Sequence, residues 1–371
     1  MNRYEAYLAP PEEQKSVANL WREGMSDSRI QDVIEKRLAW FYETNPVGPA
    51  KTWFVKDTQA NELIGCASVY PRRVRVGDRI VNAGVMSDFL VSKKHRIAGP
   101  ALQLQRTLAE QSASAGFEFI YGYPNNLAWP IFKRIGYEAV AQSVMWVKPL
   151  RTGYKLGELT DSRLEPYVGP RLREKLVPPA ARIGSLIGDR VLQANDLRLA
   201  VGKLRGITCD IQQRADASFD ALEFASSGLC DVSGARDSAY LNWRYADHPT
   251  QRYSFFRMVD TVSGSLRGFV VFREEEDKVF LLDAVWDGPP AAGEALVLAF
   301  ARRMYEEGKV SICIYYAGTT SVVEILPKLL FFRRAGERNL IAYVPKERDD
   351  AFRKRVLTEN SWAMYDGELD I

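Results

Sequence analysis

The sequence predicts a mixed α/β (α+β) protein built from two similar domains, and three observations support this. The chain has 371 residues, more than a single hydrophobic core usually organises. Strand and helix patterns follow one another in the same order twice, which indicates an internal duplication. Between the two copies, residues 151–205 mix Gly and Pro with basic helical stretches. We therefore expect a domain at 1–150, a helical connector at 151–205, a second domain at 206–350 and a C-terminal tail at 351–371.

The first half begins with a short strand and two helices and then becomes rich in strands. Pro followed by acidic residues at 10–13 is a helix-start signal, and Gly116 ends the helix that follows Gly99. Alternating apolar residues indicate the strands. The predicted strands are 4–9, 52–57, 63–76, 79–92, 117–124 and 139–150, and the predicted helices are 10–25, 30–45, 100–115 and 126–136.

The second half repeats the later part of this order. It opens with strands, and then a helix, a strand, a helix and a final strand follow. The predicted strands are 206–214, 252–260, 266–286, 310–317 and 339–345, and the predicted helices are 291–307 and 320–331.

The charge balance excludes several classes of protein. Fifty basic residues stand against 47 acidic ones, a net charge of +3, and they are spread along the chain rather than gathered as in a nucleic-acid-binding protein. The four cysteines lie far apart and there are only two histidines, so neither a metal site nor a disulfide framework is expected. The start lacks a signal-peptide pattern, and no apolar stretch could span a bilayer. We expect a cytoplasmic protein without membrane insertion.

A run of positive charge precedes one of the predicted helices. Lys93, Lys94 and Arg96 are followed by Gly99 and Pro100, and the chain then continues as an amphipathic helix. A helix N-terminus presents unpaired backbone N–H groups and the positive end of the helix dipole. Gly99 would let the backbone approach an anion closely, and Pro100 suits the first helical turn. The stretch therefore predicts a phosphate-binding turn.

The same turn carries a family resemblance. Residues 96–101, "RIAGPA", preceded by a strand at 85–91, resemble the pyrophosphate-binding motif (Gln/Arg)-x-x-Gly-x-(Gly/Ala) of the GNAT superfamily of N-acyltransferases. The later segment "NNLAWPIFKRIGYE" is similar to that family's Asn-x-x-Ala…Gly-(Phe/Tyr) signature. The resemblance covers residues 4 to about 150 and, more loosely, 206–345. It implies two GNAT-like domains, each a mixed, mostly antiparallel twisted sheet flanked by helices.

The resemblance also implies the co-substrate, which is acyl-coenzyme A, with no metal. The pantetheine arm would lie between two parallel strands that part, and the acceptor amine would attack the thioester directly. The residues expected at coenzyme A are Phe89, Leu90, Val91, Arg96, Ala98, Gly99, Ala101, Leu102, Asn125 and Phe132.

Candidate proton-transfer groups lie near this site. Asp88 is the candidate base, because apolar neighbours surround it in the strand before the turn; alternatively, it is a strand-end carboxylate held by backbone amides. The family often has an acidic Tyr where this chain has Phe132, which cannot donate a proton. Tyr121 and Tyr123 are the candidate acids, or else half-buried strand residues. We expect His95, beside the basic run, on the solvated rim of the phosphate site.

The second half is expected to bind the acceptor rather than coenzyme A. Its matching turn, at 285–300, carries Asp287 and Glu294 where cations would be needed. The segment "SAYLNWRYADHP" at 238–249 gathers rings and a guanidinium, which suit either a protein core or a ligand-binding wall. The candidate acceptor-binding residues are Tyr240, Trp243, Arg244 and Tyr245.

The expected activity is transfer of an acyl group from acyl-coenzyme A to the amine of a small polar acceptor. Tandem GNAT-like proteins of this kind resemble sugar N-acyltransferases, so we expect a nucleotide-linked amino sugar used in surface-polysaccharide synthesis. A non-catalytic acyl-coenzyme A sensor, a FemAB-like or peptide acyltransferase and a small-amine acyltransferase are the alternatives. We expect a monomer or a homodimer.

Overall fold

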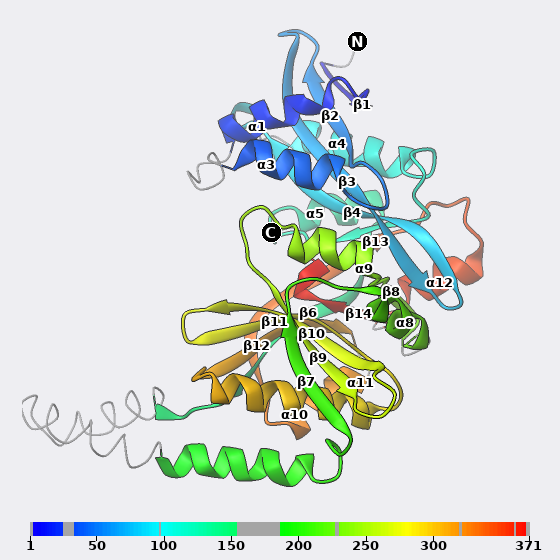
Figure 1. Ribbon diagram of the computed structural model, residues 1–371. Coiled ribbons are helices and arrows are strands. Elements are labelled where there is room, and N and C mark those ends of the chain that lie inside the picture. Colours follow the sequence, from blue (N-terminus) through cyan, green and yellow to red (C-terminus); the bar gives the residue numbers. More distant parts are fainter. Residues whose placement is uncertain are drawn as a thin grey trace, which may run out of the picture.

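The computed structural model describes residues 3–24, 33–95, 98–153, 186–226, 230–318, 321–359 and 361–368. These residues form a mixed α/β fold in which helices cover a long twisted sheet, as the sequence predicts (Figure 1).

The first half follows the predicted order closely. The main difference is the strand predicted at 117–124, of which only three residues are paired. The elements are β1 (Tyr4–Leu8), α1 (Val17–Gly24), α3 (Ile34–Leu38), η2 (Ala39–Glu43), β2 (Lys51–Asp57), β3 (Glu62–Val76), β4 (Arg79–Val91), η3 (Lys93–His95), α4 (Ala98–Gln111), β5 (Ile120–Gly122), α5 (Trp129–Ile135) and β6 (Glu138–Pro149), with a 3-10 turn η1 (Gln14–Ser16) before α1.

The second half contains helices that the pattern did not predict, at 217–225 and 238–241. Residues 186–200 of the connector are helical. The elements after it are β7 (Ile207–Gln212), α8 (Ala217–Ala225), β8 (Val232–Gly234), α9 (Ser238–Leu241), η4 (Asn242–Ala246), β9 (Ser254–Asp260), β10 (Leu266–Glu275), β11 (Lys278–Trp286), α10 (Pro290–Glu306), β12 (Ser311–Gly318), α11 (Ser321–Lys328), β13 (Phe332–Tyr343), α12 (Asp350–Leu357), β14 (Trp362–Tyr365) and η5 (Asp366–Glu368).

The two halves share their central strands. The described strands form one 14-stranded sheet whose main path runs β1-β2-β3-β4-β5-β13-β6-β12-β11-β10-β9-β7. Strand β13 of the second half lies between β5 and β6 of the first, and β6 in turn lies between β13 and β12. Both halves therefore depend on strands from the other, although the elements of each half remain nearly contiguous in sequence.

The C-terminal residues predicted as a tail are part of this framework. Strand β14 pairs with β12 and with β8, and β8 pairs with β3. The hydrogen-bonded neighbours β3, β4, β5, β13, β6, β12, β14 and β8 thus form a closed ring. Trp362 of β14 is fully buried, and its ring lies 5.7 Å from that of Phe119 and 5.2 Å from that of Tyr121. Residues 361–368 therefore help to join the two halves.

A repeated segment lies where the halves meet. Residues 37–46, "RLAWFYETNP", and 240–249, "YLNWRYADHP", each contain a π-helical turn, η2 and η4. The rings of Trp40 and Trp243 stack at 5.2 Å. The indole N–H of Trp40 donates to the carbonyl of Trp243 (2.6 Å), and that of Trp243 donates to the carbonyl of Trp40 (2.9 Å). This reciprocal pair relates the halves symmetrically and supports the predicted duplication.

Candidate active site

Strands β4 and β5 pair only briefly before they part. They run parallel and pair at Gly84 with Ile120 and at Val85 with Tyr121. Beyond Val85, β4 continues to Val91 and stays paired with β3. Phe89, Leu90 and Val91 lie on this later stretch, where the ladder to β5 has ended. This is the separation that we expect beside a pantetheine arm.

A β-bulge directs Asp88 into the interior. The register between β3 and β4 shifts between Cys66 and Ser68, and Asp88 has a φ of 51°, which Asp tolerates better than most residues. Tyr42 donates to Asp88 Oδ2 (2.7 Å), and Arg37 Nη1 lies 3.2 Å from Oδ1. Burial and the neighbouring carboxylate raise the pKa of Tyr42 well above its usual value. The side chains of Tyr42 and Arg37 thus help to hold Asp88 in place.

Tyr42 and Arg37 have no role in the sequence prediction. Tyr42 also forms a hydrogen bond with Ser68 Oγ (2.7 Å), and the guanidinium of Arg37 lies 4.5 Å from the ring centre of Trp21. The signal that could have identified Tyr42 is its repetition. Tyr245 stands at the same place in the second copy of the repeated segment.

The predicted phosphate-binding turn begins helix α4. Arg96 lies outside the described residues, and α4 spans Ala98–Gln111, two residues earlier at its start than the predicted 100–115. A Cβ atom on Gly99 would meet no protein atom within 4 Å, so the helix N-terminus faces open space. Ala101 and Leu102 are half-buried in the first turns of α4. The backbone here has room for the anion that the sequence predicts.

His95 occupies a different environment from the one expected. Its side chain is only 15% exposed and packs edge-on against Tyr4, whose hydroxyl lies 3.4 Å from His95 Nδ1. Asp57 Oδ2 lies 4.0 Å from the same nitrogen. His95 therefore connects η3 to β1 and β2 rather than standing on a solvated rim.

The other predicted coenzyme A residues have structural contacts. Phe132 is buried and packs edge-to-face on Phe89 and Tyr137, with ring centres 5.8 and 5.0 Å apart. Asn125 Oδ1 accepts from the backbone N–H of Leu127 (3.1 Å) and Ala128 (2.9 Å), which fixes the turn before α5. Phe132 is thus a core residue that supports Phe89, and Asn125 shapes the start of α5.

The two candidate acids differ in exposure. Tyr121 is fully buried in the closed ring of strands, with its ring against Trp362. Tyr123 lies just beyond β5 and is partly buried at the edge of the same core. Of the two, Tyr123 has the better access to an incoming substrate, and its role as acid stays a prediction.

The four candidate acceptor residues do not form an open wall. Tyr240, Trp243, Arg244 and Tyr245 are each at most 4% exposed. Arg244 Nε donates to the carbonyl of Gly367 (2.9 Å), and Trp243 is covered by Trp40. The structure places these side chains in the core between the halves, because the repeated segments pack against one another there. A ligand could reach them only after the halves separate.

The second half has a copy of the Asp88 network. Tyr245 donates to Asp283 Oδ2 of β11 (3.3 Å), and Arg236 Nε donates to Oδ1 of the same residue (2.6 Å). The register between β10 and β11 also shifts beside Asp283. Each half therefore contains a tyrosine, an aspartate and an arginine in the same relation, whether or not it has an open phosphate-binding turn.

In the second half, the space that corresponds to the gap between β4 and β5 is occupied by β14 and the residues that follow it. Strands β11 and β12 pair in parallel as far as Leu281, after which β14 pairs with β12. Gly367, just after β14, packs so closely against β11 that an added Cβ would lie 2.8 Å from the carbonyl of Leu282. A Cβ atom on Gly293 of α10 would likewise lie 2.7 Å from the Trp286 ring.

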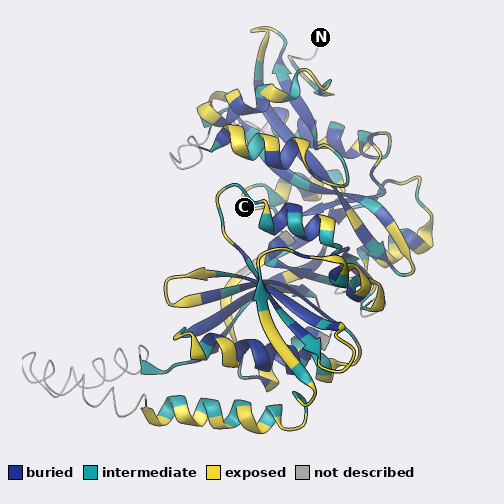
Figure 2. Ribbon diagram, viewed as in Figure 1, coloured by how far each residue is buried: buried dark blue, intermediate teal, exposed yellow. Residues whose placement is uncertain are grey.

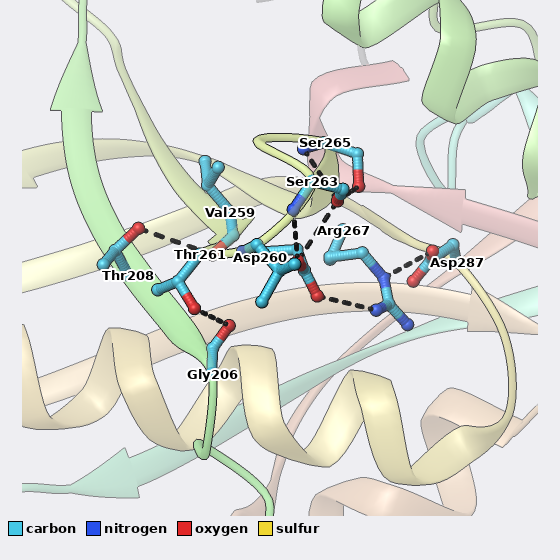
Figure 3. A network of polar contacts seen from close by, with 10 residues as sticks. Gly206, Thr208, Val259, Asp260, Thr261, Ser263, Ser265, Arg267 and Asp287 are labelled. Carbon is cyan, nitrogen blue, oxygen red and sulfur yellow. Dashed lines mark hydrogen bonds and ion pairs between the residues drawn. The ribbon is translucent and has the colours of Figure 1, made fainter.

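Charge also disfavours an anion in the second half. Asp287 precedes α10 and accepts from Arg267 Nε (2.6 Å), within the network shown in Figure 3. Glu294 of α10 pairs with Lys203. Arg267 and Lys203 are thus engaged by carboxylates at the start of α10, and the expectation that this half binds no coenzyme A stays a prediction.

A large cavity lies on the α1 and α3 side of the first half. Its volume is about 610 Å³, and Tyr42 lies in its wall. Because Tyr42 also donates to Asp88, one side chain connects the cavity to the bulge in β4. The polar and charged lining consists of Gln14, Lys15, Arg22, Glu35, Tyr42 and Glu43.

Metal ligands do not gather in the described part of the chain. Among those residues, no group of three or more His, Cys, Asp or Glu side chains could hold a metal ion. In the same residues, no helix has the length and apolar character needed to cross a bilayer.

Comparison with known proteins supports the assignment of the first half. Residues 7–140 match the family model described as an acetyltransferase (GNAT) domain. No curated protein matches the sequence.

Solved structures share the fold across both halves. A probable N-acyltransferase from Enterococcus faecalis V583 superposes with a TM-score of 0.60 at 10% identity, covering 93% of this chain and 73% of its own. A GCN5-related N-acetyltransferase from Anabaena variabilis ATCC 29413 has a TM-score of 0.60 at 12% identity, covering 92% and 72%. The N-myristoyltransferase of Saccharomyces cerevisiae with bound myristoyl-CoA has a TM-score of 0.53 at 10% identity, covering 92% and 83%. At these identities the likeness is one of fold.

Proposed function

We propose that this chain, whose residues 7–140 match an acetyltransferase (GNAT) domain model, is an acyl-coenzyme A-dependent transferase that acylates the amine of a small polar acceptor bound in the cavity beside Tyr42. The observation that carries the proposal is the position of Tyr42, which lines the cavity and contacts Asp88. An acceptor held in this cavity would lie next to Tyr42, which contacts Asp88 at the bulge in β4.

The residues present fit coenzyme A in the first half. Open space at Gly99 suits the pyrophosphate, and the end of the β4–β5 ladder suits the pantetheine arm. When bound, acyl-coenzyme A supplies the thioester that the amine attacks. Lys93 and Lys94 precede α4 and are exposed, so they can neutralise phosphate charge. The backbone at the bulge orients the thioester.

The chain's own groups then handle the protons. We propose that Asp88 accepts a proton from the acceptor ammonium, either directly or through Tyr42, and that Arg37 and Tyr42 keep its carboxylate oriented. Tyr123 is the proposed donor to the leaving thiolate. Transfer is direct, because a positioned amine needs no enzyme nucleophile.

The cavity favours an acceptor that carries both an amine and other polar groups. Glu43 can receive an ammonium, while Lys15 and Gln14 can bind hydroxyl or acidic groups. Glu35, in the same wall, already pairs with Arg22. An amino sugar has this chemistry. We restrict the proposal to the sugar itself, because Arg244, the residue expected to bind a nucleotide diphosphate, is buried and donates to Gly367.

The test follows release of free thiol from acetyl-coenzyme A with amino sugars, amino acids, polyamines and short peptides. We expect the fastest release with amino sugars. Glu43→Gln should raise the KM for the acceptor at least about fivefold and leave the KM for acetyl-coenzyme A unchanged, because it removes a charge from the cavity alone. Glu62→Gln, on an exposed residue of β3, is the matched control. Peptides or polyamines as the fastest acceptors would refute the sugar assignment.

A second candidate function is acyl-coenzyme A sensing without catalysis. Phe132, in place of the tyrosine that the family often has, favours it, since a buried Phe cannot protonate a thiolate. Binding of acyl-coenzyme A without thiol release for every amine would support the sensor and exclude the enzyme.

A further inference from the structure

The helix at residues 186–200 is held to the rest of the molecule by one face. Asp196 pairs with Lys148 of β6 (2.9 Å), a lysine whose side chain is 1% exposed and which also donates to the carbonyl of Leu329 (2.8 Å). Asp189 accepts from the backbone N–H (2.6 Å) and the hydroxyl (2.9 Å) of Thr152. A Cβ atom on Gly188 would lie 2.6 Å from the Thr152 hydroxyl, so the helix approaches closely here. These contacts fix the rotation of the helix.

The opposite face of this helix is apolar and exposed. Leu186, Ile187, Val191, Leu197 and Val201 each expose 58% to 79% of their surface. At 100° per residue they fall within one arc of about 140°, together with the exposed Ala194. The helix is the unlabelled green one below α10 in Figure 1, and in Figure 2 it alternates between exposed and intermediate residues. Single exposed apolar side chains are ordinary, but a continuous stripe along a helix marks an interaction surface.

The charges on this face have one sign. Between residues 186 and 201, the exposed residues are apolar or arginine, and the arginines are Arg190 and Arg198. Both acidic residues of the stretch, Asp189 and Asp196, are bound on the inner face. Among the residues that the structure describes, no carboxylate forms an ion pair with Arg190 or Arg198. The exposed face therefore combines apolar side chains with positive charge, and its complement is an apolar surface with negative charge.

A second copy of the chain is a poor complement. The exposed stripe is centred near Ala194, so two antiparallel helices packed through it would bring Arg190 of each copy close to Arg198 of the other. Like charges at such spacing repel, and no acidic residue on the exposed face of this stretch offsets them.

We propose that the helix at 186–200 docks the protein on an anionic lipid surface. The apolar stripe would enter the boundary between head groups and acyl chains, and Arg190 and Arg198 would contact the negative head groups. The helix would lie in the plane of the membrane without crossing it. This surface is separate from the acyltransfer site and does not depend on the proposed acceptor.

The test is co-sedimentation of the full chain with vesicles. We expect binding to vesicles of phosphatidylcholine and phosphatidylglycerol in equal amounts, and at least about tenfold weaker binding to phosphatidylcholine alone. The triple variant Ile187→Ser, Val191→Ser and Leu197→Ser should lose at least about tenfold in binding, because it removes most of the stripe. Val262→Ser, at a 94% exposed position in the turn between β9 and β10, should bind as the parent does.

A second variant and a second measurement complete the test. Arg190→Gln with Arg198→Gln should weaken binding to the mixed vesicles and reduce its dependence on salt, with the apolar stripe intact. Absence of binding by the parent, or equal binding by the triple variant, would overturn the proposal. So would a parent dimer in sedimentation velocity that the triple variant separates, because a second copy would then cover this face.

Discussion

Asp88 is the single residue on which the proposed chemistry depends most. Asp88→Asn should lower kcat by about a hundredfold or more and change coenzyme A affinity little, because a proton acceptor acts on the chemical step. Kinetics and calorimetry measure the two effects. Asp283→Asn is the matched control, since Asp283 makes the same contacts with Tyr245 and Arg236 in the half whose corresponding site is filled. Equal turnover of Asp88→Asn and the parent at every pH would remove Asp88 from the mechanism.

A second residue, Asp366, makes the free energy of unfolding depend on pH. Burial raises the pKa of Asp366 to about 6 from a usual 3.8, against the opposing effect of Arg338, Arg273 and Arg244. The folded chain then holds a proton that the unfolded chain releases, so this residue costs stability as the pH rises from about 4 to about 6. Asp366→Asn removes that cost.

The expected gain is therefore itself dependent on pH. Asp366→Asn should match the parent in free energy of unfolding near pH 3.5 and exceed it by up to about 3 kcal/mol at pH 7, from a shift of about two pKa units. Urea unfolding of both proteins across this range measures the difference. A difference that stays constant with pH would contradict the assignment.

At the scale of elements, the N-terminus of α4 decides whether coenzyme A binds. Gly99→Glu should abolish binding, because it places a carboxylate where the pyrophosphate approaches the helix, while the fold tolerates the side chain in open space. Val262→Glu adds the same charge at an exposed turn of the second half and should bind normally. Calorimetry with coenzyme A measures both. Parental affinity in Gly99→Glu would place the cofactor elsewhere.

The sequence predicts local elements well and their partners poorly. The turn at Gly99 and most strands are visible because capping signals and alternation are local. The insertion of β13 between β5 and β6 depends on pairing across about 200 residues, for which periodicity carries no information. Arg244 shows the same limit, since a guanidinium beside aromatic residues has the same local sequence whether it faces a ligand or the carbonyl of Gly367.

At the scale of the whole molecule, the halves resemble two domains but share one framework. Strand β6 has β13 on one side and β12 on the other, so residues 1–150 alone would leave both of its edges unpaired. The indole of Trp40 would also lose both its hydrogen-bond acceptor and the ring stacked on it, because Trp243 supplies both, and this exposes apolar surface to water. The family-model match at residues 7–140 therefore ends before the strands that complete the sheet.

We accordingly expect residues 1–150, expressed alone, to lack a cooperative unfolding transition and to bind no coenzyme A. Co-expression with residues 151–371 should restore both, because the second fragment supplies β13 and β8 to the first. Circular dichroism during thermal unfolding and calorimetry with coenzyme A measure the two properties for the fragment, the reconstituted pair and the full chain. The full chain bearing Gly99→Glu is the control for binding, since it should unfold cooperatively without coenzyme A affinity. The expected failure to fold has a physical reason, since unpaired strand edges and exposed apolar surface favour aggregation over a folded state. Cooperative unfolding of residues 1–150 on their own would contradict it, and would mean that β8 and β13 add stability without being required for folding.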